Sequence, residues 1–148
     1  MPELSSRVNI FTDSVIRRMT RISEAYGAIN LSQGFPDFDP PKEILDALAY
    51  AAYNGPHQYT FTYGSYNLRS ALAKKHGKAI NRTIDPDMEV LVTCGGTEAM
   101  MSAMMTICNP GDNVIIFSPY YENYRADTIL SGANPIIVPL NPPDYSFD

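Results

Sequence analysis

Short β-branched runs that alternate with helical stretches constrain the fold of this chain most. Three such runs occur in its second half, at Val90–Thr93, Val114–Phe117 and Ile136–Val138. Stretches with helical character separate them, near Thr97–Cys108 and Tyr121–Ser131. Continuous apolar strands that alternate with helices are typical of a mainly parallel sheet that is buried on both faces. We therefore predict an α/β fold.

The first half of the chain predicts three helices. One starts at the N-cap candidates Asp13 and Ser14, a second begins at Pro41, and a third starts at Ser65 and ends at Gly77. In each of them apolar side chains recur at helical spacing, which predicts an inward-facing apolar stripe. The segment Gln33–Pro41 contains three prolines, so we expect it to run in extended form.

A glycine turn carries the chain from the first predicted strand into a helix. The sequence VTCGGTEAM, Val92–Met100, places two glycines directly before a helix expected to restart at Thr97. Free backbone N–H groups and the positive end of the helix dipole favour a phosphate or carboxylate at such a helix start. The alternative is a tight turn capped by Thr97, with Glu98 complementing the dipole. Both interpretations stay open from these residues alone.

Composition and charge exclude several classes of protein. The chain has 148 residues and a formal net charge of -5, whereas a nucleic-acid-binding protein normally presents a basic face. His57 and His76 are isolated, which predicts no metal site, and Cys94 and Cys108 are expected to be reduced and buried. No basic segment precedes a long apolar run, and the most apolar helix is too short for a membrane span. We expect a soluble, cytoplasmic protein whose partners are small molecules or other proteins.

Four motifs occur in an informative order. They are SQGFPDF at Ser32–Phe38, QYTFTYGSYNLR at Gln58–Arg69, VTCGGTEAM at Val92–Met100, and PGDNVIIFSPYYENY at Pro110–Tyr124. Together they resemble the N-terminal portion of a fold-type I, pyridoxal-phosphate-dependent aminotransferase of classes I and II. The resemblance extends from about Asp13 onward. The first motif is closest to kynurenine, glutamine–phenylpyruvate and methionine aminotransferases.

The resemblance implies roles for five residues toward pyridoxal 5'-phosphate and substrate. Gly96 and Thr97 match the loop whose backbone amides hold the cofactor phosphate, and Tyr121 matches the aromatic residue that stacks on the pyridine ring. Tyr59 matches a tyrosine that reaches the neighbouring subunit's phosphate in a homodimer. Gly34 matches the glycine whose backbone meets the substrate's α-carboxylate. Tyr121 and Tyr59 have packing alternatives, and Gly34 has a turn alternative.

The resemblance also implies a domain division and an incomplete fold. Residues 1–40 would form the N-terminal arm and a small-domain segment, and residues 41–148 the N-terminal part of the large domain that binds pyridoxal phosphate. In relatives of this kind the large domain is a mainly parallel sheet sandwiched by helices, and strands from later sequence separate its first strand from the next two. We therefore expect the fold to be incomplete alone, with exposed strand edges. The Ser118–Pro119 bond is expected to be cis, as in relatives.

The family's Schiff-base lysine is not matched in this chain. The only lysines are Lys42, Lys74, Lys75 and Lys78, and all of them precede the glycine turn. The resemblance therefore implies that the chain contains no catalytic residue, and that it contributes only the phosphate- and ring-binding half of the site. We expect the remainder of the enzyme on a second chain, or lost by truncation or cleavage.

The predicted activity is transfer of an amino group between an amino acid and a 2-oxo acid. The wording of SQGFPDF favours an aromatic or large neutral amino acid as donor. Two alternatives stay open at this point. One is a carbon–sulfur lyase on the same fold, because its cofactor-binding motifs would look alike. The other is a non-catalytic protein that keeps the fold as a binding or regulatory domain.

Overall fold

The structure is a computed structural model that describes residues 3–148. In chain order its elements are a 3-10 helix (Ser6–Ile10), α1 (Val15–Ala25), α2 (Lys42–Asn54), α3 (Tyr66–Ala79), α4 (Gly95–Ile107), β1 (Asn113–Ser118), α5 (Glu122–Leu130) and β2 (Asn134–Pro139). The chain divides into two compact units. One comprises the described residues up to Arg18 together with Thr93–Asp148, and the other is Met19–Val92.

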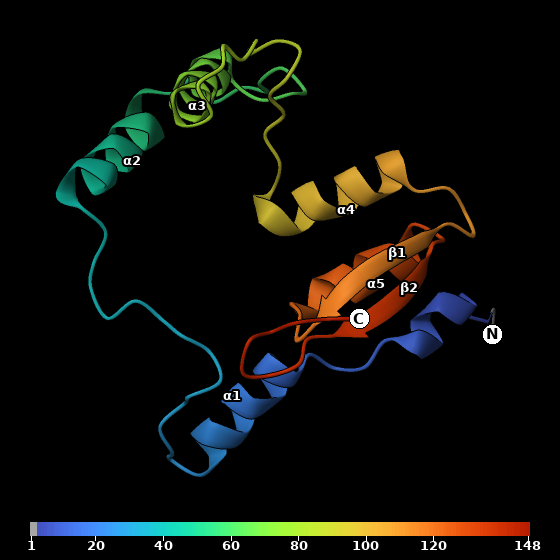
Figure 1. Cartoon of the computed structure of the whole chain (residues 1–148). Coiled ribbons are helices and arrows are strands. Elements are labelled where there is room, and N and C mark those ends of the chain that lie inside the picture. Colours follow the sequence, from blue (N-terminus) through green and yellow to red (C-terminus); the bar gives the residue numbers. More distant parts are fainter. Residues whose placement is uncertain (1–2) are drawn as a thin grey trace. The chain divides into compact units, whose positions relative to one another are not determined.

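The first unit is built on a β1–α5–β2 crossover. Strands β1 and β2 pair in parallel, with Asn113 opposite Asn134 and Ser118 opposite Pro139. Parallel strands require a crossover connection, and α5 supplies it by packing against both strands (Figure 1). Helix α4 packs in turn against α5. The predicted α/β fold is confirmed for this unit.

The core of this unit lies between the sheet and α5. Ile116 of β1 is buried, as are Thr128 of α5 and Ala133 in the turn before β2. The opposite face of the strands carries Ile115 and Ile136, which are exposed side by side in the ladder. Alternation of buried and exposed residues along β1 therefore reflects the single helix that covers the pair.

The run Val90–Thr93 is not a strand, so the prediction of a third strand was wrong. Within residues 3–148 the sheet has two strands, and Val90–Thr93 does not pair with either. Its link to a distant segment is the Val92 N–H, which donates to the Tyr63 carbonyl at 3.0 Å. A β-branched run becomes a strand only where a neighbouring strand completes a ladder of hydrogen bonds. The extended run reaches α4 without such a neighbour.

The three helices of the first half are confirmed, and their starts agree with the predictions to within two residues. The end of α3 differs, because the helix passes through Gly77 and continues to Ala79. Gly77 is buried, and its carbonyl accepts a hydrogen bond from the Arg82 N–H at 2.9 Å. A Cβ at this position would overlap the Arg82 carbonyl oxygen. Glycine is therefore required here for close approach of the returning chain, and it does not end the helix.

The apolar stripes of α1 and α2 are present but exposed. Neither helix contains a buried residue among those described. On α1, Met19 and Ile22 are exposed, and on α2 the same holds for Leu45 and Leu48. The prediction of the stripes was correct in sequence pattern and wrong in burial. Spacing fixes which side chains share a face, whereas burial needs a partner surface.

The domain boundary at residues 40 and 41 stays a prediction. The division into compact units follows a different line, between Arg18 and Met19 and again between Val92 and Thr93.

Among the described residues, no helix combines the length and the apolar character that crossing a bilayer requires.

Asp127 carries a buried carboxylate oxygen that has no hydrogen-bond partner, the one such side-chain atom among the described residues. The residue lies on α5 with 5% of its surface exposed, and its Oδ2 atom has no hydrogen-bond partner. Burial raises the pKa of this carboxyl above its ordinary value of 3.8. The charged form is therefore disfavoured in the folded chain relative to the unfolded chain.

We expect replacement of Gly77 by alanine to destabilise the second unit by about 1–3 kcal/mol, because the new methyl group meets backbone and not a flexible side chain. Urea denaturation followed by circular dichroism measures the change. Gly96→Ala is the matched control, since a Cβ at Gly96 meets no atom within 4 Å. Equal midpoints for the two variants would contradict the close-approach role of Gly77.

Asp127→Asn is expected to change how stability depends on pH. With the folded pKa raised, the stability contributed by the protonated carboxyl is fully present below about pH 3.8 and is lost as pH rises through the raised pKa. The amide cannot ionise, so the variant should gain stability relative to the parent across that rise and keep the gain at neutral pH. Urea midpoints measured from pH 3 to pH 8 test this, and parallel curves for parent and variant would contradict it.

Candidate functional site

The start of α4 is the centre of the candidate site. The helix begins at Gly95, two residues earlier than the predicted start at Thr97. Gly95 has φ +80°, a left-handed conformation that favours glycine, and its N–H donates to the Thr93 carbonyl at 2.8 Å. Both glycines therefore belong to the first helical turn, and Thr97 is not the N-cap. The alternative of a turn capped by Thr97 does not hold, because the helix begins at Gly95 and Cys94 is the residue before it.

The first turn of α4 presents hydrogen-bond donors with open space beside them. The N–H groups of Gly96 and Thr97 lie in the part of a helix where no intrahelical acceptor exists. No heavy atom lies within 4 Å of a Cβ placed on Gly96. Thr97 adds a hydroxyl, and among the described residues its own proton is donated to no protein acceptor. This set of backbone N–H groups and one hydroxyl has the chemistry to bind a phosphate.

Glu98 and Cys94 form a hydrogen bond at the start of α4. The Glu98 carboxylate accepts a hydrogen bond from the Cys94 N–H, so the side chain reaches back to the residue before the helix. This contact satisfies one of the free donors and leaves those of Gly96 and Thr97 open. Cys94 is a free thiol, and it is exposed, contrary to the prediction that it is buried. A residue at the rim of an open helix start has no packed neighbours to cover it.

Tyr121 lies at the start of the next helix. It is the residue directly before α5, and half of its surface is exposed. Its ring meets that of Tyr124 in a T-shaped arrangement, with 5.9 Å between centroids and 78° between planes. Tyr121 is therefore not buried within this unit, and its role stays a prediction. The Ser118–Pro119 bond that precedes it is cis, as predicted.

A side-chain hydrogen bond joins the two helix starts. The Asn123 Nδ2 donates to the Thr97 Oγ1 at 3.1 Å. Asn123 is the second residue of α5, two positions after Tyr121, and α4 and α5 pack against one another. The structure thus brings the predicted phosphate contact Thr97 and the segment of the predicted ring contact Tyr121 to one place. Sequence reasoning missed Asn123, because a polar residue on the first turn of a helix carries no signal of its partner.

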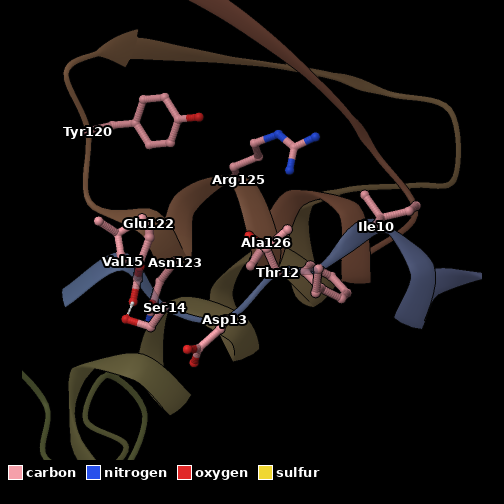
Figure 2. Close-up of a pocket in the computed structure, with 11 residues that line it drawn as sticks. Ile10, Thr12, Asp13, Ser14, Val15, Tyr120, Glu122, Asn123, Arg125 and Ala126 are labelled. Carbon is pink, nitrogen blue, oxygen red and sulfur yellow. Dashed lines mark hydrogen bonds between the residues drawn. The ribbon is translucent and has the colours of Figure 1, made fainter. Parts of the chain in front are cut away.

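A pocket of about 320 Å³ lies on the same unit, between the N-terminal segment and the start of α5. Figure 2 shows it with residues of that segment facing others from the start of α5, namely Tyr120, Glu122, Asn123, Arg125 and Ala126. Asn123 lines this pocket as well as contacting Thr97. The Ser14 hydroxyl donates to the Glu122 Oε1 at 2.7 Å and so ties the two segments together (Figure 2). These residues are over a hundred positions apart in sequence, so periodicity offers no signal for the contact.

Gly34 belongs to the second unit and lies in an open turn. It is exposed, and a Cβ at Gly34 would meet no atom within 4 Å. The preceding residues are held by Asn30, whose Oδ1 accepts from the Ser32 N–H at 3.0 Å and from the Gln33 N–H at 3.3 Å. The Asn30 Nδ2 donates to the Thr20 hydroxyl at 3.1 Å and so fixes this turn to α1. The backbone of Gly34 is accessible to a ligand.

Tyr59 lies in the same unit, fully exposed, on the loop between α2 and α3. The base of this loop is held by Arg69, which is 3% exposed. The Arg69 Nε donates to the Gly64 carbonyl at 3.0 Å, and a second nitrogen donates to the Asp87 carboxylate at 2.8 Å and to the Pro86 carbonyl. The guanidinium carbon also lies 5.8 Å from the ring centroid of Phe61. The loop is therefore anchored at its base while Tyr59 at its tip is free of neighbours to pack against.

No group of three or more His, Cys, Asp or Glu side chains that could hold a metal ion occurs in the described part of the chain. The site consists of helix-start donors, one hydroxyl and an exposed aromatic ring. A parallel β–α–β unit with such donors near the carboxyl end of β1 is typical of α/β proteins that bind phosphorylated ligands at a helix start.

Comparison with known proteins makes this class specific. Residues 26–148 match the model of the family described as aminotransferase class I and II, and the chain belongs to this family. It is similar to the probable N-succinyldiaminopimelate aminotransferase DapC of Mycobacterium tuberculosis, with 37% identity over 96% of this chain and 36% of that protein. It is also similar to the methionine aminotransferase of Escherichia coli K12, with 36% identity over 91% of this chain and 35% of that protein.

The fold agrees with solved structures of the same kind. The crystal structure of YbdL from Escherichia coli, for which a methionine aminotransferase function is identified, superposes with a TM-score of 0.91 and 34% identity, covering 100% of this chain and 39% of that chain. The chain spans about a third of the length of the curated relatives it matches. Relatives of this family are pyridoxal phosphate enzymes, and the names do not favour a lyase or a regulatory domain.

Loss of the Glu98 side chain is expected to weaken the start of α4. We expect Glu98→Ala to lower the free energy of unfolding by about 1 kcal/mol, because the Cys94 N–H loses its acceptor. Glu43→Ala is the control, since Glu43 also lies in a first turn, that of α2, and among the described residues its carboxylate accepts no hydrogen bond. There only the dipole term of about 0.3 kcal/mol should be lost. Urea denaturation measures both, and equal losses would contradict the capping role of Glu98.

Proposed function

We propose that this chain supplies the phosphate- and ring-binding part of a pyridoxal-phosphate-dependent aminotransferase. In this proposal the phosphate lies at the start of α4, on the N–H groups of Gly96 and Thr97 and on the Thr97 hydroxyl. The pyridine ring lies against Tyr121. The whole protein would move an amino group between an amino acid and a 2-oxo acid.

One observation carries this proposal: the Asn123–Thr97 hydrogen bond of 3.1 Å that joins the starts of α4 and α5. A phosphorylated aromatic ligand needs an anion site and a flat surface within one molecule's length. Thr97 belongs to a helix start with open donors, and Tyr121 lies two residues before Asn123 with its ring half exposed. Their proximity supports a ligand with a phosphate at one end and a ring at the other.

The residues of this chain would bind and orient, and would carry no proton in the reaction. Gly96 permits close approach of the phosphate, because no atom occupies the space a Cβ would take. Tyr121 would fix the plane of the ring. Pyridoxal phosphate, when bound, would supply an aldehyde that can take up the amino group and a ring that withdraws electrons from the reacting bonds. The family's lysine that would shuttle the substrate's proton is not matched among these 148 residues.

The substrate class is proposed from the motif around Gly34 and from the relatives. Gly34 would bind the substrate's α-carboxylate through its backbone, which is accessible in the structure. Relatives at 34–37% identity are named as acting on methionine, kynurenine and N-succinyldiaminopimelate. An aromatic or large neutral amino acid as donor is consistent with the first two of these names.

The proposed enzyme is a cytoplasmic homodimer. Tyr59 projects from an anchored loop with its side chain fully exposed, which suits a residue that reaches the phosphate site of a second subunit. The exposed stripes of α1 and α2 support a larger assembly, because apolar faces of this size are stabilised by burial. Further sequence of the enzyme and the second subunit would cover them.

The phosphate site can be tested by nuclear magnetic resonance on the ¹⁵N-labelled chain. Pyridoxamine 5'-phosphate is the probe, because it has no aldehyde to react with surface lysines, and pyridoxamine is the matched ligand without phosphate. We expect the amide signals of Gly96 and Thr97 to shift with the phosphorylated probe only. Thr97→Val removes the hydroxyl at constant shape, and we expect it to weaken binding roughly tenfold, as for a hydrogen bond to a charged group.

Thr106→Val is the control variant for this titration. Thr106 lies on the last turn of α4, where its hydroxyl donates to the Ser102 carbonyl at 2.7 Å. The same substitution there should leave the binding of pyridoxamine 5'-phosphate unchanged. Equal shifts with pyridoxamine and its phosphate, or unchanged binding by Thr97→Val, would argue against a phosphate site at α4.

A further inference from the structure

We propose that Asn123 is a positioning residue that orients the Thr97 hydroxyl toward the phosphate and makes phosphate binding depend on α5. This inference rests on the proposed function, because it concerns the same phosphate site. Its basis is the Asn123 Nδ2 to Thr97 Oγ1 hydrogen bond of 3.1 Å, which links the second residue of α5 to the first turn of α4.

The direction of this hydrogen bond determines what Thr97 can do. Asn123 donates through its amide, so a lone pair of the Thr97 oxygen is occupied from the α5 side. A threonine hydroxyl has one proton and two lone pairs, and its proton then points away from the donor. Within residues 3–148 that proton is donated to no protein acceptor. The hydroxyl proton is therefore available for donation toward the open side of the turn.

Two donors in series suit an anion. In the proposed complex, the Asn123 amide donates to the Thr97 hydroxyl, and the hydroxyl donates to a phosphate oxygen. Each hydrogen bond in such a chain polarises the next, so the hydroxyl becomes a better donor than one without a neighbour. A carboxylate at position 123 would reverse the direction, because it would accept the Thr97 proton and withdraw it from the phosphate. It would also add a negative charge beside the phosphate.

Asn123 also couples two contacts that are separate in sequence. Tyr121 precedes it by two residues, and the helix that both define packs against α4. Asn123 further lines the pocket in which residues 10–15 face the start of α5 (Figure 2). The position of the phosphate donor is thereby tied to the segment that carries the proposed ring contact.

The test is a double-mutant cycle on the ¹⁵N-labelled chain, with pyridoxamine 5'-phosphate as probe. We expect Asn123→Ala to weaken binding roughly threefold to tenfold, the range of a single hydrogen bond. Asn123→Asp should weaken it further. In a Thr97→Val background, Asn123→Ala should have no additional effect, because its only route to the phosphate is gone.

A second readout is the pKa of the bound phosphate, followed by its ³¹P signal against pH. Donors to the dianion lower that pKa relative to free pyridoxamine 5'-phosphate. We expect Asn123→Asp to bring it back toward the free value. Asn134→Asp is the matched control, because it makes the same change at the first residue of β2, where the side chain contacts the Gly111 carbonyl. It should leave both binding and the ³¹P titration unchanged.

The outcomes separate the two proposals. If Thr97→Val weakens binding while Asn123→Ala and Asn123→Asp bind like the parent, the positioning role of Asn123 is overturned and the phosphate site stands. A loss from Asn123→Ala that persists undiminished with Val at position 97 also overturns it, because Asn123 would then act through general structure. If Thr97→Val itself has no effect, the phosphate site fails. Asn123→Asp has the shape of the parent side chain, so it reports even if the alanine variant is unstable.

Discussion

The parallel pairing of β1 with β2 is the constraint on which the candidate site depends. Because parallel strands cannot be joined by a tight turn, the chain must leave the end of β1 and return along α5. This places Tyr121 and Asn123 at the carboxyl end of β1, where α5 begins. Helix α4 packs on α5, so its own start can meet Asn123. The juxtaposition of two helix starts follows from the crossover.

The positive electrostatic potential at the start of α4 comes from backbone N–H groups more than from charged side chains. The donors at the start of α4 are fixed in direction by the helix, and they carry the positive end of its dipole. Glu98 is the nearby carboxylate of that turn, and it is engaged with the Cys94 N–H. Pre-oriented dipoles need little rearrangement when an anion arrives.

Local features of the fold were predictable from sequence, and contacts between distant segments were not. Helical spacing identified α1, α2 and α3, and β-branched runs identified β1 and β2, because these signals depend on neighbours a few residues away. The same signal misassigned Val90–Thr93, since a ladder needs a second strand. Glycine chemistry identified the turn at Gly95 and Gly96 but placed the helix start two residues late. Asn123 has no local signature, because its role is defined by Thr97, 26 residues away.

Arg69 has a consequence for how this part of the chain can vary. Its guanidinium binds Gly64 on one side and the segment with Pro86 and Asp87 on the other, so these segments share one cation. A lysine could not reproduce this fork of donors. Segments exchanged between homologous sequences should therefore carry the loop, α3 and the residues up to Asp87 together. A crossover point inside that stretch would separate the buried Arg69 guanidinium from its hydrogen-bond acceptors. Residues 64–87 should therefore be exchanged as one segment.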